Sequence, residues 1–124
     1  MSEKKDKWID AVAKIIKLTQ EGKIIWKTAE PHSTPSYETI RISFVTDYKD
    51  HVLRLYEKDV KHTGPAIGLA GGYVETETVL EMVDQDGVGI WAFPSTSAIE
   101  NLMSAVRFQV SRANDFINDI LSEE

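Results

Sequence analysis

The chain has no cysteine, no long apolar run and no dense cluster of basic residues, and each absence excludes a class of protein. Without a cysteine among its 124 residues, it forms no disulfide, zinc–thiolate site or cysteine nucleophile, and its stability must come from packing alone. No apolar run approaches the roughly 18 residues of a membrane-spanning helix. The charged segment Met1–Lys7 is not typical of a secretory signal. We therefore expect a cytoplasmic protein with no membrane partner.

Basic residues are fewer than acidic ones. The 14 lysines and arginines face 20 aspartates and glutamates, which gives a formal net charge of -6 with neutral histidines. This charge repels the phosphate backbone of nucleic acids, and no local group of Lys and Arg offsets the repulsion. We expect no nucleic-acid partner, and solubility is the simplest interpretation of the acidity.

Length and composition are those of one globular domain. Hydrophobic residues make up 42% of the chain and charged residues 27%, which argues against disorder and against a fibrous assembly. No linker, internal repeat or low-complexity segment divides the sequence. We predict a single α+β domain over residues 1–124.

Two amphipathic helices are predicted, one near each end of the sequence. The first covers about residues 6–20 and ends at Gly22, because a glycine in this place can take the left-handed conformation that closes a helix. The second covers about residues 97–121 and would be roughly 35 Å long. Its Ser97 and Glu100 fit a capping box. One apolar stripe runs down this second helix, made of Ile99, Leu102, Val106, Val110, Ala113, Ile117 and Ile120.

Five short segments between the helices show the alternation typical of strands. They cover residues 23–28, 39–44, 53–56, 73–83 and 88–93. Asp86-Gly87 is typical of a hairpin turn, and most of the other connections are also short. The pattern predicts a two-layer α+β fold, with an N-terminal helix, a five-stranded and mainly antiparallel meander sheet, and a long C-terminal helix. Both helices are expected on one face of the sheet.

The other face of the sheet is expected to be open to water and to present an interaction surface. Arg41, Arg54 and Tyr56 would lie there on the middle strands, beside glutamates of the fourth strand. Phe108 and Phe116 lie off the main stripe of the last helix, so its apolar surface is wider than one sheet face requires, unless the first helix covers the excess. The candidate interaction surface consists of Arg41, Arg54, Tyr56, Trp91, Phe108 and Phe116.

Residues 61–72 form a second candidate region. Four glycines and one proline within these twelve residues predict a long loop. Such a loop can close over a ligand held against the sheet, although it lacks the Gly-Lys-Ser/Thr ending of a phosphate loop. The candidate ligand-loop residues are His62, Gly68, Gly71, Gly72 and Tyr73.

Motifs for catalysis or metal binding are missing. The three histidines lie in separate connections and are not spaced for joint ligation. Asp84–Gly87 begins like a calcium loop, but Met82 and Phe93 would occupy ligand positions and cannot coordinate calcium. The hydroxyl cluster Ser95–Ser97 has no nucleophile elbow around it. We expect no cofactor and no metal, and the pattern favours a non-enzymatic role without deciding it.

One short segment resembles known proteins. The run Leu18-Thr19-x-x-Gly22-Lys23-Ile24-x-Trp26, directly after an amphipathic helix, is similar to the opening of small prokaryotic proteins of unknown function. The resemblance covers about nine residues. It supports the fold class and implies no activity and no site residues.

Three hypotheses for function follow. The first is a non-enzymatic protein-interaction or regulatory module that acts as a homodimer. The second is a small-molecule binding protein or minor hydrolase, with a pocket between the sheet and the 61–72 loop. The third is an immunity or antitoxin-like inhibitor that presents its acidic surface to a basic toxin.

Overall fold

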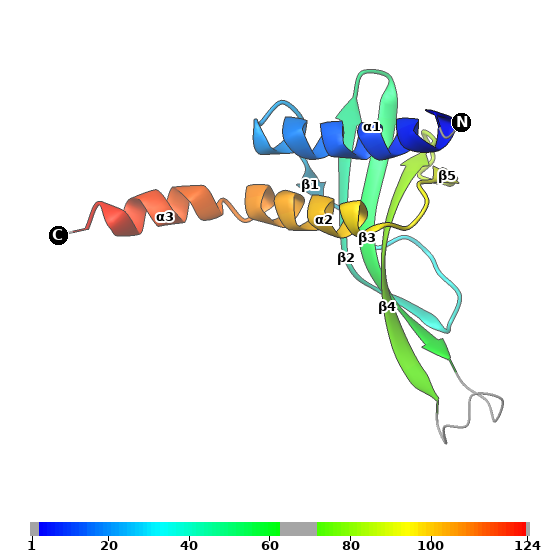
Figure 1. Cartoon of the computed structure of the whole chain (residues 1–124). Helices are drawn as coiled ribbons and strands as arrows, with labels where there is room; N and C mark the ends of the chain where they lie inside the picture. Colours follow the sequence, from blue (N-terminus) through cyan, green and yellow to red (C-terminus); the bar gives the residue numbers. More distant parts are fainter. Residues whose placement is uncertain (1–2, 63–71, 124) are drawn as a thin grey trace.

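In the residues that the structure describes, a five-stranded antiparallel sheet and three helices form an α+β fold with two layers (Figure 1). The computed structural model describes residues 3–62 and 72–123. The elements in chain order are α1 (Glu3–Gln20), β1 (Lys27–Thr28), β2 (Glu38–Tyr48), β3 (His51–His62), β4 (Tyr73–Val83), β5 (Gly89–Ala92), α2 (Ser97–Val110) and α3 (Ala113–Leu121).

The sheet is a meander in which each strand pairs with the next one along the chain. Its order is β1-β2-β3-β4-β5 and every pairing is antiparallel. In register, Leu55 of β3 lies between Phe44 and Leu80, and these three side chains share one face. Arg54 and Tyr56 alternate with Leu55 and therefore lie on the opposite face. The predicted meander is confirmed.

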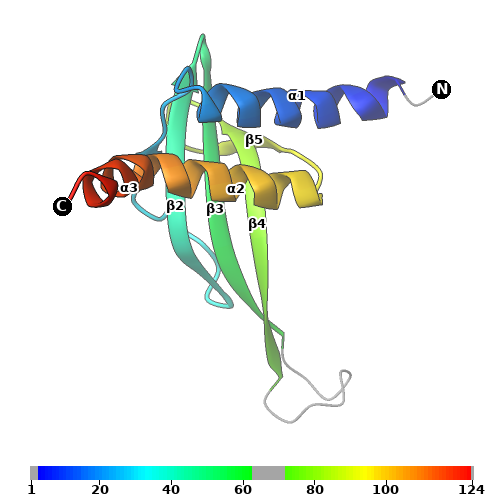
Figure 2. The same ribbon diagram turned by 60° about the vertical axis from the view of Figure 1, so that its left-hand side comes forward.

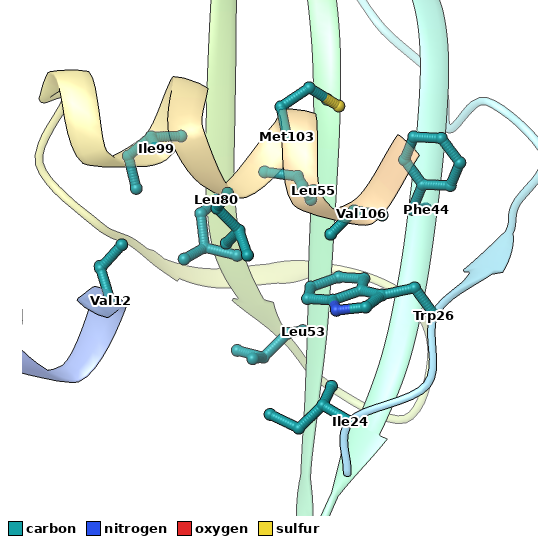
Figure 3. Packing of buried hydrophobic residues seen from close by; sticks show 11 residues of the cluster. Val12, Ile24, Trp26, Phe44, Leu53, Leu55, Leu80, Ile99, Met103 and Val106 are labelled. Carbon is teal, nitrogen blue, oxygen red and sulfur yellow. The ribbon is translucent and has the colours of Figure 1, made fainter. Parts of the chain in front are cut away.

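The helices α1 and α2 cross the same face of the sheet (Figure 2). They pack against each other, and α2 also contacts β4. The side chains between the two layers form one core, since the inward residues of the strands meet the apolar stripes of both helices (Figure 3). The core consists of Val12, Ile24, Trp26, Phe44, Leu53, Leu55, Leu80, Ile99, Leu102, Met103 and Val106. The expected position of both helices on one face is confirmed.

The end of α1 explains why the first strand is shorter than predicted. Gly22 has a φ of 74°, and the backbone N–H groups of Lys23 and Ile24 both donate to the carbonyl of Leu18, at 2.8 and 3.2 Å. These donors are therefore not available to a sheet. A strand over residues 23–28 was expected, but only Lys27–Thr28 pair with β2.

A bulge in β2 interrupts the alternation of its side chains between the two faces of the sheet. The register shifts between Ile40 and Ile42, which face Lys58 and Glu57 of β3 respectively. Because Lys58 and Glu57 point to opposite faces, Ile40 and Ile42 do so as well. Regular alternation through this strand was expected and is wrong at this point.

The predicted single C-terminal helix is two helices. At the junction Arg112 has a left-handed φ of 57°, and its N–H donates to the carbonyl of Gln109 at 3.1 Å, so that α2 ends there. The Ser111 hydroxyl caps the same end by donating to the Phe108 carbonyl at 3.1 Å. The apolar periodicity continues through the junction because α3 resumes one residue later. For this reason the sequence pattern does not reveal the break.

The start of α2 also differs from the expected capping box. Thr96 is the N-cap residue, and Ser97 is already the first residue of the helix. No side-chain hydrogen bond caps this end, which is closed by the backbone bond from the Ile99 N–H to the Thr96 carbonyl at 3.1 Å. The predicted capping box is wrong because the helix begins one residue earlier than the pattern requires, so that Ser97 lies inside the helix and not at its N-cap position.

Across residues 3–62 and 72–123, no helix is both long enough and apolar enough to cross a bilayer.

Candidate functional site

An ion pair lies on the sheet face opposite the helices. Arg54 of β3 and Glu81 of β4 are register partners, and the Arg54 Nε donates to Glu81 Oε2 at 2.7 Å. A second guanidinium nitrogen donates to the same oxygen. The remaining arm donates to the carbonyl of Gly87, in the β4–β5 turn, at 2.8 Å. Arg54 thus joins β3, β4 and this turn through its side chain alone.

A glycine makes room for the carboxylate of this pair. The Glu81 side chain lies over the backbone of Gly89 in β5, where an added Cβ would come within 2.7 Å of Glu81 Oε1. A larger residue at this position would displace the end of the Glu81 side chain. Gly89 therefore keeps the carboxylate in reach of Arg54.

The connection between β1 and β2 covers part of this face. His32, in that connection, packs edge-on against the Tyr56 ring with centroids 4.7 Å apart. Arg54, Tyr56 and Glu81 are all buried, with exposed fractions of 7%, 6% and 9%. The expectation that this face is open to water is wrong for these three residues, and Arg54 and Tyr56 do not belong to an exposed interaction surface.

Burial determines the protonation of the two rings in this cluster. It raises the pKa of Tyr56 to about 12, with a further contribution from the negative charge of Glu81. It also lowers the pKa of His32 below its usual 6.5, and the positive charge of Arg54 lowers it further. The phenol and the imidazole are therefore both neutral at neutral pH. Neither His32 Nδ1 nor the buried Ser43 hydroxyl has a hydrogen-bond partner in the described part of the chain, so no nucleophile and base are joined there.

The raised pKa of Tyr56 predicts a late step in an alkaline titration. Among the four tyrosines, Tyr56 should contribute the absorbance change of ionised tyrosine that appears near pH 12. The folded state holds this proton more tightly than the unfolded chain does. Its contribution to stability is therefore complete below pH 10 and is lost as the pH rises toward 12. Tyr56→Phe should remove the late step in the absorbance titration. Tyr37→Phe changes an exposed tyrosine and should leave this step in place. A late step that remains in Tyr56→Phe would contradict the assignment to Tyr56.

Arg41 and Trp91 lie apart from this cluster. Arg41 is the extra residue of the β2 bulge, and its guanidinium reaches Glu57 and Asp59, each at 3.8 Å, on the helix side of the sheet. Its expected place beside Arg54 is wrong because the bulge redirects its side chain. Trp91 faces Met82 in register, lies 47% exposed at the sheet edge and packs edge-on against Phe93.

The predicted ligand loop is described only at its base. His62 ends β3, stacks on Tyr73 with centroids 4.8 Å apart, and its Nε2 lies 2.9 Å from a carboxylate oxygen of Glu75. Gly72 precedes β4 with a φ of 77°. Gly68 and Gly71 lie outside the described residues. A ligand between the sheet and this loop stays a prediction.

An exposed apolar surface lies at the C-terminal end of the described chain. The helix α3 extends away from the body of the protein (Figure 1), and no residue of it is buried. Phe116 on α3 is 66% exposed, and Phe108 on α2 is 49% exposed. Both residues lie off the main apolar stripe of the predicted C-terminal helix, and both are exposed. The first helix does not cover the excess apolar surface.

An open groove adjoins this surface. It runs between the second half of α1 and the outer side of α2, ends at Arg112 and at Asn114 and Asp115 in the first turn of α3, and has a volume of about 980 Å³. Its apolar lining includes Ile16, Ile25, Ala105 and Phe108. The groove lies on the side of the helices that does not face the sheet, so it is separate from the Arg54 cluster. The sequence pattern gave no signal for it, because it forms only where α1 and α2 come together.

Comparisons with known proteins give no relative to place beside this geometry. No protein-family model, no curated protein and no solved structure matches the chain. The similarity of residues 18–26 to small prokaryotic proteins thus stays a prediction. In the described ranges 3–62 and 72–123, no three histidine or acidic side chains come together in a group that could hold a metal ion.

Proposed function

We propose that this chain is a non-enzymatic protein-interaction module that acts as a homodimer through its C-terminal helix. The observation that carries the proposal is the stripe on α3, where Phe116, Ile117, Ile120 and Leu121 are exposed by 66%, 41%, 55% and 77%. These positions follow one another at helical spacing and therefore form one continuous face.

In a monomer, α3 and its apolar face would be exposed to water, which is unfavourable for the stability of this helix. A helix of nine residues is too short to be stable in water by itself, and its stability in proteins comes from packing an apolar face. Here α3 has the apolar face but packs little against the rest of its own chain. A contiguous apolar patch of this kind is typical of a protein–protein contact. A partner that covers the stripe would both hide apolar surface and hold the helix.

The proposed module acts in the cytoplasm. It has no disulfide to lose, so a reducing compartment does not lower its stability. The exposed face of α3 is apolar, which supports a role in protein contact. The chain has no cysteine for thiol redox chemistry, which favours a contact role over a redox role.

The mass of the protein in solution tests this proposal. Light scattering during size exclusion at micromolar concentration should give twice the chain mass of 14.0 kDa. Phe116→Gln together with Ile120→Gln should weaken the dimer about 100-fold or more, because large apolar side chains at the centre of an interface contribute most of its affinity. Both residues are exposed, so the fold of the monomer should remain.

A matched control lies on the polar side of the same helix. Asn118→Gln changes an exposed α3 residue outside the stripe and should leave the dimer intact. A wild-type protein that stays monomeric across the micromolar range would overturn the homodimer. Equal dimer strength in the doubly substituted protein would overturn the role of α3.

A further inference from the structure

We propose that α3 of one copy docks into the groove between α1 and α2 of a second copy, and that the exchange is reciprocal. This inference rests on the homodimer proposed above and specifies its geometry. The groove and α3 supply the two complementary halves of the contact, and each copy carries both.

The floor of the groove suits a helix. On α2 it is formed by Asn101, Ser104, Ala105 and Phe108, which follow one another at helical spacing on one side. Ser104 and Ala105 are small, so a second helix can approach α2 closely there. The opposite wall includes Ile16 of α1, which adds apolar surface to the floor.

The dimensions of groove and helix agree. At a rise of 1.5 Å per residue, the nine residues of α3 are about 13 Å long. The stretch of α2 from Asn101 to Gln109 along the groove also covers nine residues and is therefore about 13 Å long by the same measure. The α3 stripe can therefore contact the groove over its whole length, in the way that amphipathic helices occupy apolar grooves in other complexes.

The junction between α2 and α3 favours a second copy over the same chain as the occupant. Arg112 takes a left-handed conformation and its Nε donates to Asp115 at 2.9 Å, which holds the first turn of α3. With this junction α3 extends beyond the end of α2 (Figures 1 and 2), whereas docking in its own groove would require it to reverse direction within two residues. A neighbouring copy meets α3 in its observed orientation.

The exposed apolar area approaches that of a standard protein interface. Six exposed residues contribute, with exposed fractions of 58%, 49%, 66%, 41%, 55% and 77% for Ile25, Phe108, Phe116, Ile117, Ile120 and Leu121. At about 200 Å² for a fully exposed large side chain, these fractions correspond to roughly 700 Å² per protomer. Standard protein interfaces bury about 800 Å² per partner, so reciprocal docking reaches this size with little help from polar residues.

Cysteine crosslinking tests the geometry, because the natural chain has no cysteine to interfere. Two copies of the full chain are prepared with tags of different size, one carrying Ser104→Cys in the groove and the other Ile120→Cys on α3. After mixing and mild oxidation, the crosslinked heterodimer should form at least tenfold more than in a control mixture of Asp50→Cys with Ile120→Cys. Asp50 is exposed in the β2–β3 turn and lies outside the groove.

Other outcomes would overturn the docking geometry in distinguishable ways. If Ile120→Cys alone gives a crosslinked homodimer and the Ser104→Cys mixture does not, α3 pairs with α3, and the homodimer stands while groove docking fails. If a chain with both substitutions crosslinks within itself and stays monomeric, α3 folds into its own groove, and both proposals fail. A dimer with no crosslink in either mixture also refutes groove docking.

Discussion

Arg54→Met is expected to lower the free energy of unfolding by about 3–5 kcal/mol, because it leaves the Glu81 carboxylate buried without its partner. The Arg54 and Glu81 side chains are only 9% and 12% exposed, so water cannot replace the lost contacts. The substitution also removes the hydrogen bond to the Gly87 carbonyl. Such a loss is a large part of the 5–15 kcal/mol that stabilises a typical domain. Urea unfolding followed by circular dichroism measures it.

Two controls separate a buried charge from the loss of a side chain. Lys23→Ala breaks an exposed ion pair with Glu21 and should lower the free energy of unfolding by about 1 kcal/mol or less. Arg54→Met combined with Glu81→Leu removes both charges and should recover much of the lost stability. If Arg54→Met lowers the free energy of unfolding no more than Lys23→Ala does, the Arg54–Glu81 pair is not buried in solution.

Gln109→Ala is expected to lower the free energy of unfolding by about 2–4 kcal/mol. The Gln109 amide makes three hydrogen bonds, each of which contributes about 1 kcal/mol, and its removal leaves partly buried backbone groups without a partner. Its Oε1 accepts from the Trp26 N–H at 2.8 Å. Its Nε2 donates to the carbonyls of Thr19 and Ile24 at 2.9 and 2.8 Å. One side chain of α2 thus holds both the end of α1 and the segment that leads into β1. Thermal or urea unfolding measures the loss.

A carboxylate at the same position distinguishes the roles of the two amide atoms. Gln109→Glu keeps an acceptor for the Trp26 N–H but removes the donor and places an oxygen opposite two carbonyls. We expect it to destabilise the protein at least as much as Gln109→Ala. The exposed control Gln20→Ala should change the free energy of unfolding by about 0.5 kcal/mol or less. Wild-type stability in Gln109→Glu would show that the two donated bonds contribute nothing.

The candidate sites were predictable only in part. The sequence indicated that Phe108 and Phe116 depart from the main apolar stripe of the last helix, but it left open whether the first helix covers them. It did not indicate the groove, because Ile16, Ile25 and Ala105 come from three separate segments. The burial of Arg54 was missed for a similar reason. Opposite charges on neighbouring strands were visible in the pattern, but the cover that removes them from water was not.

The kinds and order of the elements were determined by the sequence itself. Local periodicity depends on which residues in a segment are apolar. It predicted both helical regions, the five strands and the sheet face on which Leu53 and Leu55 lie. The turn at Asp86-Gly87 followed from the same local chemistry, since Gly87 has the positive φ of 81° that glycine adopts readily.

Tertiary structure alone decided which polar residues are buried and where the regular elements are interrupted. The left-handed conformation of Arg112 divides a continuous apolar stripe into two helices, and the β2 bulge redirects the side chain of Arg41. An arginine at these two positions does not predict a helix break or a bulge. The burial of Arg54, Tyr56 and Glu81 accompanies contacts with segments distant in the chain, namely His32 against Tyr56 and the β4–β5 turn against Arg54. Such features arise from contacts between residues far apart in the chain, whose free energies exceed the small local preferences that a sequence pattern records.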